Sequence, residues 1–158
     1  MLETASGLSG CDPDILFAIL TLALEIAREG REGKRVGTLF IVGHPDRVLA
    51  SSRLLILDPL AGHSPQLTHV TDPRLRGTVK ELAQLDGAFV IAEDGTVLSA
   101  GRYLDVSTAD IEIPLGLGTR HLAAAATSRR FDVVAVAVSE AGLVRVFCGG
   151  EIVATLTP

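Results

Sequence analysis

Apolar residues recur along the chain in two patterns, one typical of helices and one typical of buried strands. Helical spacing is clearest from Ile15 to Ala27. It follows Asp12-Pro13, where a carboxylate can cap free N–H groups and Pro suits the first helical position. The sequence therefore predicts a helix over about residues 13–29. Because Phe17 and Leu22 make its other side apolar as well, we expect it either to be deeply buried or to pack on another copy of the chain.

Continuous apolar runs over residues 36–42 and 133–139 are typical of strands in the middle of a sheet. Shorter runs on both sides of a two-residue turn predict two hairpins, 88–92 with 96–100 and 143–148 with 151–156. A second Asp-Pro pair predicts a helix from Asp72 to about Leu85, and an Ala-rich segment predicts another over 120–130. The remaining segments are less regular: 48–57 fits a strand or a short helix, 58–71 and 114–118 fit loops, and 103–113 fits extended or irregular chain.

Helices alternate with strands early in the chain, and hairpins dominate late. This order predicts an α/β fold with a central mixed β-sheet flanked by helices. A length of 158 residues suits one domain, 1–158, with the N-terminal helix over about 13–29 and a core over about 35–158.

Composition narrows the classes of partner. The formal net charge of -5 does not provide the basic surface that nucleic-acid binding requires, so we expect no nucleic-acid partner. The longest apolar stretch, 15–24, is roughly half of a membrane span. The polar start of the chain lacks the pattern of a signal peptide, so we expect a cytoplasmic protein without a membrane partner. Cys11 and Cys148 form no spaced pair and are expected to be buried free thiols.

The first candidate site is Asp86-Gly87-Ala88, at the expected change from helix to strand. A helix C-terminus carries partial negative charge, so a carboxylate there costs roughly 0.3–1 kcal/mol. Gly87 lets the backbone turn sharply or approach a ligand closely. Two interpretations stay open: an ordinary turn, or a metal-binding carboxylate at a sheet edge, where α/β folds commonly hold ligands.

The second candidate is Gly118-Thr119-Arg120-His121, at the expected start of a helix with Thr119 as its N-cap. Free N–H groups and the dipole of a helix N-terminus attract anions. The same dipole disfavours Arg120 and His121, unless a bound polyphosphate lies between them. The alternative is a capped helix with an exposed Arg and an incidental His.

Ser139-Glu140 follows a buried strand, so its side chains either emerge at a strand end beside a ligand or belong to an ordinary turn. The remaining histidines lie in expected loops without metal-ligand spacing, and we assign no role to His44, His63 or His69.

At these residues the chain resembles the diadenylate cyclase family, the DisA nucleotide-binding domain. That family is marked by an Asp-Gly-Ala motif and by an Arg-His motif preceded by Gly-Thr, in the order and spacing found here. The context agrees at Leu85, at Ala123-Ala124 and at Ser139-Glu140, and residues 29–40 resemble the beginning of the domain. The resemblance extends from about residue 15 to the end of the chain.

The resemblance implies condensation of two ATP molecules into cyclic di-AMP with release of two pyrophosphates, by facing protomers in a dimer or in a larger assembly of dimers. It implies that Asp86 binds a divalent metal, Mn²⁺ or Mg²⁺, and helps to activate a 3′-hydroxyl, with Glu140 as a second metal ligand. The nucleotide-binding residues that it implies are Gly87, Ala88, Tyr103, Leu104, Gly118, Thr119, Arg120, His121, Ser139 and Glu140.

One position departs from the family pattern. Many relatives have a second Arg directly after the His, where this chain has Leu122. The site could bind phosphate more weakly or recruit another cation such as Arg102 or Arg129. The chain could also be a catalytically weak or inactive regulatory module that binds ATP or cyclic di-AMP, although the intact Asp86 and Glu140 argue against this. A structural subunit whose turns mimic the motifs is a third interpretation.

Overall fold

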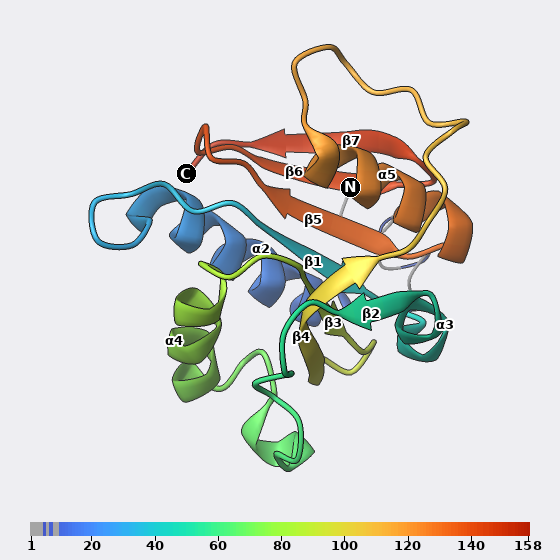
Figure 1. Ribbon diagram of the computed structural model, residues 1–158. Helices are drawn as coiled ribbons and strands as arrows, with labels where there is room; N and C mark the ends of the chain where they lie inside the picture. The colour runs from blue at the N-terminus through green and yellow to red at the C-terminus, as the bar shows by residue number, and fades with distance from the viewer. Residues whose placement is uncertain (1–4, 6, 8–9) are drawn as a thin grey trace.

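The computed structural model describes residues 5, 7 and 10–158, and the expectation about a signal peptide falls largely outside them. At its centre is a mixed sheet of seven strands in the order β2-β4-β3-β1-β5-β6-β7 (Figure 1). The strands are β1 (Thr38–Val42), β2 (Ser52–Leu54), β3 (Ala88–Ile91), β4 (Val97–Leu104), β5 (Val134–Val138), β6 (Val144–Cys148) and β7 (Glu151–Leu156). The helices are α2 (Pro13–Glu29), α3 (Pro45–Ala50), α4 (Pro73–Leu82) and α5 (Thr119–Phe131), with a 3₁₀ turn at Pro65–Leu67.

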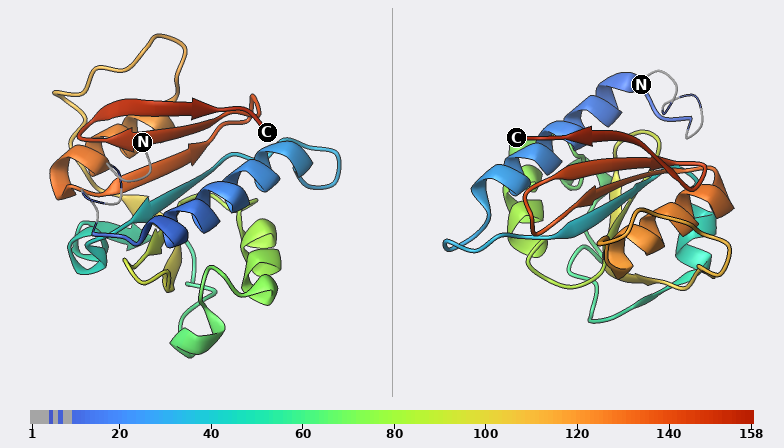
Figure 2. Two further views of the ribbon diagram at one scale, coloured as in Figure 1. Left: turned by 180° about the vertical axis from the view of Figure 1, so that it is seen from behind. Right: turned by 90° about the horizontal axis from the view of Figure 1, so that it is seen from above.

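Helices cover both faces of the sheet, as the view from above shows (Figure 2). One core lies between the sheet and α2 with α4, and includes the stacked rings of Phe40 and Phe89. A second core lies between the sheet and α5 with α3, and includes Leu39 and Ile41. Because neighbouring residues of a strand point to opposite faces, β1 supplies side chains to both cores and is buried throughout. The expected α/β architecture with a mixed sheet is confirmed.

Both expected Asp-Pro helix starts are confirmed. Asp12 accepts a hydrogen bond from the Asp14 N–H at 2.8 Å, and Asp72 accepts one from the Arg74 N–H at 2.9 Å. The second apolar side of α2 is not buried throughout, because Leu22 is fully buried but Phe17 is 62% exposed, and packing of this side on another copy stays a prediction.

Three boundaries differ from the expectation. The segment 48–57 contributes both a helix end and a strand, since α3 ends at Ala50 and β2 follows at once. β4 continues to Leu104 because β2 pairs with its second half, a contact between segments about fifty residues apart. α4 ends at Leu82 rather than near Leu85, because the N–H groups of Gln84 and Leu85 bond three residues back, to the Glu81 carbonyl at 3.3 Å and the Leu82 carbonyl at 3.0 Å.

The expectation for the cysteines is confirmed, since both are buried and neither forms a disulfide. Burial raises the pKa of the Cys11 thiol to about 11. Within the described part of the chain, no helix has the length and apolar character that crossing a membrane requires.

Candidate functional site

The candidate motifs meet at one edge of the sheet. β1 is parallel to β3 and antiparallel to β5, so β1 and β3 begin at the edge where β5 ends. The register places Leu39 beside Ala88 and Thr38 beside Val138. Asp86-Gly87, which precedes β3, and Ser139-Glu140, which follows β5, therefore lie on either side of the start of β1.

A cavity of about 490 Å³ opens at this edge, and Asp86, Arg120 and Glu140 all line it. The rest of its lining comes mainly from the α2–β1 loop and the α4–β3 turn, namely Arg31, Glu32, Lys34, Arg35, Val36, Gly37, Ala83, Gln84 and Leu85. The fold thus brings together one member of each candidate motif, although Asp86 and Glu140 are 54 residues apart in the chain.

Asp86 is exposed in the turn between α4 and β3, and its Oδ1 accepts a hydrogen bond from the Gly87 N–H at 3.1 Å. The expectation that it lies at a helix C-terminus is wrong, because α4 ends at Leu82. The helix dipole falls off within the last turn, so it does not account for the placement of Asp86. Exposure leaves the carboxylate accessible to a ligand in the cavity.

Gly87 allows its backbone to lie close to the backbone of Gly101 and Arg102. Its φ is 102°, and a Cβ there would lie 2.6 Å from the carbonyl carbon of Gly101 and 2.7 Å from the nitrogen of Arg102. Since Arg102 pairs with Ala88, this contact lies where β3 and β4 come together. The fold itself therefore explains why a glycine stands at position 87, without reference to a ligand.

Arg120 lies in the first turn of α5 with its guanidinium against the backbone of Gly37. A Cβ on Gly37 would be 2.2 Å from Arg120 Nη1 and 2.8 Å from its Cζ. The expectation that Thr119 caps this helix is wrong: the Gly118 carbonyl accepts the Leu122 N–H at 3.2 Å, which makes Gly118 the N-cap. No side chain caps the helix there, so its free N–H groups are left for solvent or a ligand.

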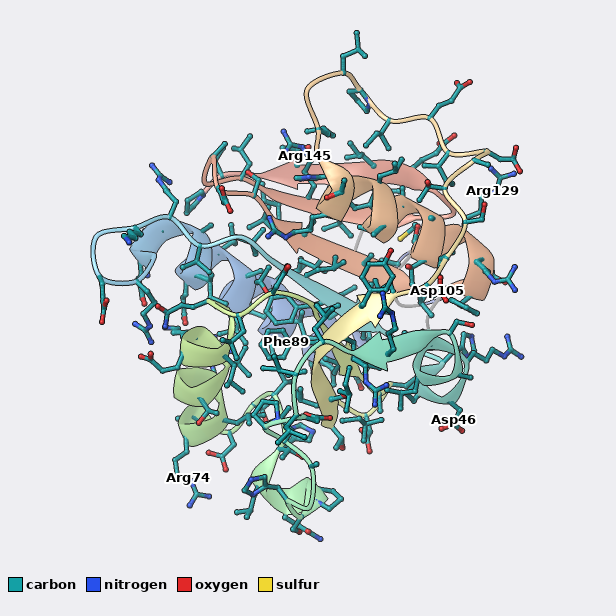
Figure 3. The ribbon with its side chains drawn as sticks, viewed as in Figure 1. Asp46, Arg74, Phe89, Asp105, Arg129 and Arg145 are labelled. Atoms are coloured by element: carbon teal, nitrogen blue, oxygen red, sulfur yellow. The ribbon has the colours of Figure 1, made fainter. Side chains whose placement is uncertain are left out.

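His121 is buried, and its ring lies 6.1 Å from that of Phe147, measured between centroids. Its Nε2 is 3.3 Å from Nη1 of Arg145, which reaches the first turn of α5 from β6 (Figure 3). A guanidinium can only donate, so Nε2 accepts and the proton of the neutral ring lies on Nδ1. Burial, with the charges of Arg145 and Arg120, holds the pKa of His121 below its ordinary value. His121 does not line the cavity, and its contact with phosphate stays a prediction.

The other predicted residues are distributed around this edge without lining the cavity. Ser139 is buried, and its Oγ accepts the Leu143 N–H at 3.3 Å inside the turn that presents Glu140. Ala88 and Leu104 belong to the core beneath α5. Tyr103 is 45% exposed, and the guanidinium of Arg53 lies 4.7 Å above its ring. Contacts of these residues with a nucleotide also stay predictions.

Four cationic residues that sequence reasoning missed lie in or beside the site. Arg31, Lys34 and Arg35 line the cavity, and none of them was among the residues predicted for the site. Arg145 interrupts an apolar strand between Val144 and Val146, a signal that could have drawn attention to it.

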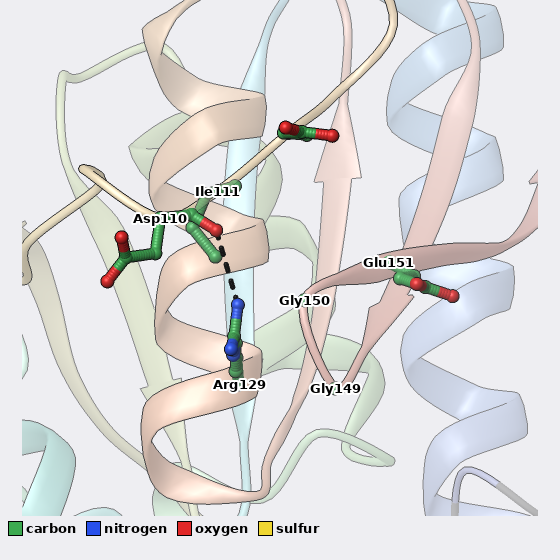
Figure 4. Close-up of a pocket in the computed structure, with 7 residues that line it drawn as sticks. Asp110, Ile111, Arg129, Gly149, Gly150 and Glu151 are labelled. Atoms are coloured by element: carbon green, nitrogen blue, oxygen red, sulfur yellow. Dashed lines mark hydrogen bonds between the residues drawn. The ribbon is translucent and has the colours of Figure 1, made fainter.

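Neither cation suggested as a substitute for the missing Arg lines this cavity. Arg102 Nε donates to Ser99 Oγ at 2.8 Å. Arg129 lies in a second cavity of about 420 Å³, between residues 110–112 and the β6–β7 turn, where its Nη1 donates to the Asp110 carbonyl at 3.2 Å (Figure 4).

The donor set of the first cavity fits a hard divalent cation that shares its coordination with a phosphate. Asp86 and Glu140 supply carboxylate oxygens, the ligands that Mg²⁺ prefers. Within the described residues no group of three His, Cys, Asp or Glu side chains is placed to hold a metal ion. Mg²⁺ sites commonly use only one or two carboxylates and take their further ligands from substrate phosphates and water.

Comparisons with known proteins agree with the motifs. The family model described as DisA bacterial checkpoint controller nucleotide-binding matches residues 25–152. The chain is 49% identical to the diadenylate cyclase of Methanocaldococcus jannaschii over 144 residues, which cover 90% of this chain and 45% of that protein. It is 39% identical to the diadenylate cyclase of Haloferax volcanii over 151 residues, covering 95% and 55%. The chain thus spans about half the length of these curated relatives.

Solved structures show the same fold at lower identity. A protein described as a hypothetical membrane spanning protein from Bacillus cereus matches with a TM-score of 0.60 and 22% identity, over 91% of this chain and 62% of that one. DacA from Staphylococcus aureus matches with a TM-score of 0.58 and 20% identity, over 88% and 84%. With most of its length matched by the family model, the chain belongs to the DisA nucleotide-binding family, the diadenylate cyclase family that its motifs resemble.

Proposed function

We propose that the chain condenses two ATP molecules into cyclic di-AMP with release of two pyrophosphates. One observation carries this proposal: Asp86 and Arg120, from the two motifs of the family, line a single cavity together with Glu140, from the segment where the context agrees. The names of the two curated relatives support the same activity. ATP as substrate also agrees with the cytoplasmic location expected from the sequence.

The chemistry required is positioning and charge neutralisation. In each of two steps a 3′-oxygen forms a bond to an α-phosphorus, the bond from that phosphorus to the bridging oxygen breaks, and pyrophosphate leaves. Arg120 binds phosphate oxygens, and the uncapped N–H groups of α5 face the same anion. Asp86 holds the attacking hydroxyl in line and favours loss of its proton.

Asp86 and Glu140 would hold a Mn²⁺ or Mg²⁺ ion. When bound, such an ion neutralises phosphate charge and lowers the pKa of the attacking hydroxyl. Arg120 lies on the same lining as the two carboxylates that would hold the ion, where it would bind phosphate oxygens.

The reaction also requires a second ATP-bearing protomer. The 3′-hydroxyl of one ATP attacks the other, so two copies must face each other, as a dimer or within a larger assembly of dimers. Specific activity is therefore expected to fall when the protein is diluted below the concentration at which copies associate.

The decisive experiment incubates the protein with ATP and either Mn²⁺ or Mg²⁺ and measures cyclic di-AMP by mass spectrometry. The Asp86→Asn variant should form no product while unfolding at the same denaturant concentration as the parent chain. Asp46→Asn is the matched control, because Asp46 is an exposed carboxylate on α3, outside the cavity lining (Figure 3). Full activity of Asp86→Asn would remove Asp86 from the mechanism.

Leu122 keeps one alternative open, a weak or inactive module that binds ATP or cyclic di-AMP. A folded, self-associated protein that binds either nucleotide but yields no product with any of several divalent metals would favour this alternative over the cyclase.

A further inference from the structure

The loop between α2 and β1 brings a set of cations to the cavity. Arg31 and Lys34 exchange backbone hydrogen bonds of 2.9 Å in both directions. The two residues between them, Glu32 and Gly33, both have positive φ values, 50° and 75°. This is the backbone pattern of a type I′ turn, which fixes the path of the loop. Arg31, Lys34 and Arg35 consequently line the cavity beside Arg120.

Arg35 bridges two elements at the rim of this cavity. Its Nη1 donates to the Ala27 carbonyl in α2 at 3.5 Å. Its guanidinium also lies against the backbone of Gly142, where a Cβ would be 2.0 Å from Nη1 and 3.1 Å from Cζ. Gly142 belongs to the turn that carries Glu140, so Arg35 is placed next to that carboxylate's turn.

Arg35 and Arg120 are thus held in the same way on two sides of one cavity. Each guanidinium contacts the backbone of a glycine, Gly142 for Arg35 and Gly37 for Arg120, that leaves room for it. The cavity carries four cationic and three acidic side chains, although the protein as a whole has a net charge of -5. Arg31 is already paired, since its Nε lies 3.1 Å from Glu81 Oε1. A ligand with several negative charges in a row would use the other cations.

We propose that Arg35 binds the β- and γ-phosphates of ATP, the part that leaves as pyrophosphate, and so supplies the second cation that Leu122 does not. The inference rests on the proposed cyclase function. Negative charge builds up on the departing pyrophosphate, and an Arg fork can bind two of its oxygens at once. Arg35 contacts α2, whereas Arg120 lies in the first turn of α5, and both line the cavity, so one triphosphate could bind both guanidinium groups.

The test is calorimetric binding of three probes in the presence of Mg²⁺: an ATP analogue with a non-cleavable α–β bridge, inorganic pyrophosphate and AMP. The Arg35→Gln variant should bind the analogue and pyrophosphate about tenfold or more weakly, as expected for loss of charge-assisted hydrogen bonds. AMP lacks the distal phosphates, so its affinity should not change. Arg35→Lys keeps the charge but loses the fork, and should lie between the variant and the parent chain.

Arg28→Gln is the matched control. This substitution removes one positive charge near the end of α2 that Arg35 contacts. The Arg28 side chain, however, is 66% exposed, pairs with Glu29 and does not line the cavity. Its binding of all three probes should equal that of the parent chain.

Unchanged affinity of Arg35→Gln for pyrophosphate would overturn the inference. Equal losses of affinity for AMP and for pyrophosphate would overturn it as well, because they would indicate that Arg35 only supports the structure through its contact with α2. Failure of the parent chain to bind the analogue and pyrophosphate would overturn both this inference and the cyclase. Arg35-dependent pyrophosphate binding without any cyclic di-AMP synthesis would support the inference and reject the cyclase alone.

Discussion

Gly87 offers a direct test of whether the motif glycine serves the fold or a ligand. An Ala at this position meets two separate penalties. The first is the positive φ of 102°, which costs a residue with a Cβ roughly 1–2 kcal/mol. The second is the backbone of Gly101 and Arg102, less than 3 Å from the new Cβ, which cannot move as a flexible side chain would. Such overpacking typically costs about 1–3 kcal/mol, so Gly87→Ala should lose roughly 2–5 kcal/mol of unfolding free energy.

Two other glycines separate these penalties. Gly33 also has a positive φ, 75°, but a Cβ there would meet nothing within 4 Å, so Gly33→Ala should lose only about 1–2 kcal/mol. Gly77 has neither penalty and lies exposed within α4, so Gly77→Ala should gain about 1 kcal/mol from helix propensity.

The assay is chemical denaturation of the three variants and the parent chain at one protein concentration, since self-association would shift apparent stability. A Gly87→Ala variant no less stable than Gly33→Ala would refute the argument from backbone contact. If that variant were also inactive, the glycine would instead be needed for the approach of a ligand.

Two further predictions concern the first turn of α5. Gly37→Ala should force the Arg120 guanidinium to move, because the new Cβ would lie 2.2 Å from Nη1. The KM for ATP should therefore rise, while the free energy of unfolding changes little. An unchanged KM would argue against the contact between Arg120 and Gly37. His121 should titrate below its ordinary value in an NMR titration, and Arg145→Met should raise its pKa by removing a neighbouring cation. In the parent chain, His121 binds a proton more readily in the unfolded state than in the folded state. The stability due to neutral His121 is therefore complete above about pH 6.5 and declines as the pH falls below it. A His121→Gln variant should lack this dependence of stability on pH.

The sequence was most informative where the deciding interactions are local. Asp12 and Asp72 cap their helices through N–H groups two residues away, and the continuous apolar run of β1 reports burial on both faces. The family motifs and their context likewise located three residues that line one cavity.

Non-local contacts were beyond such reasoning. The extent of β4 depends on its pairing with β2, and the position of Arg145 next to His121 depends on the order of β5 and β6 in the sheet. The cations of the α2–β1 loop were not predicted as site residues, because nothing in their spacing indicates which cavity the loop borders.

The edge that carries the site follows from the direction of β5. In doubly wound folds, ligands lie outside the carboxyl ends of parallel strands, because the helix N-termini lie there. Here the site lies at the amino ends of the parallel pair β1 and β3. α5 is joined to β5 by a turn of two residues, so it packs antiparallel to that strand and its N-terminus lies at the carboxyl end of β5. Because β5 runs opposite to β1, that end is the edge where β1 begins. The site therefore lies at the carboxyl end of β5 and beside a helix N-terminus, as it does in doubly wound folds. The orientation of this one strand decides where Arg120, Asp86 and Glu140 can meet.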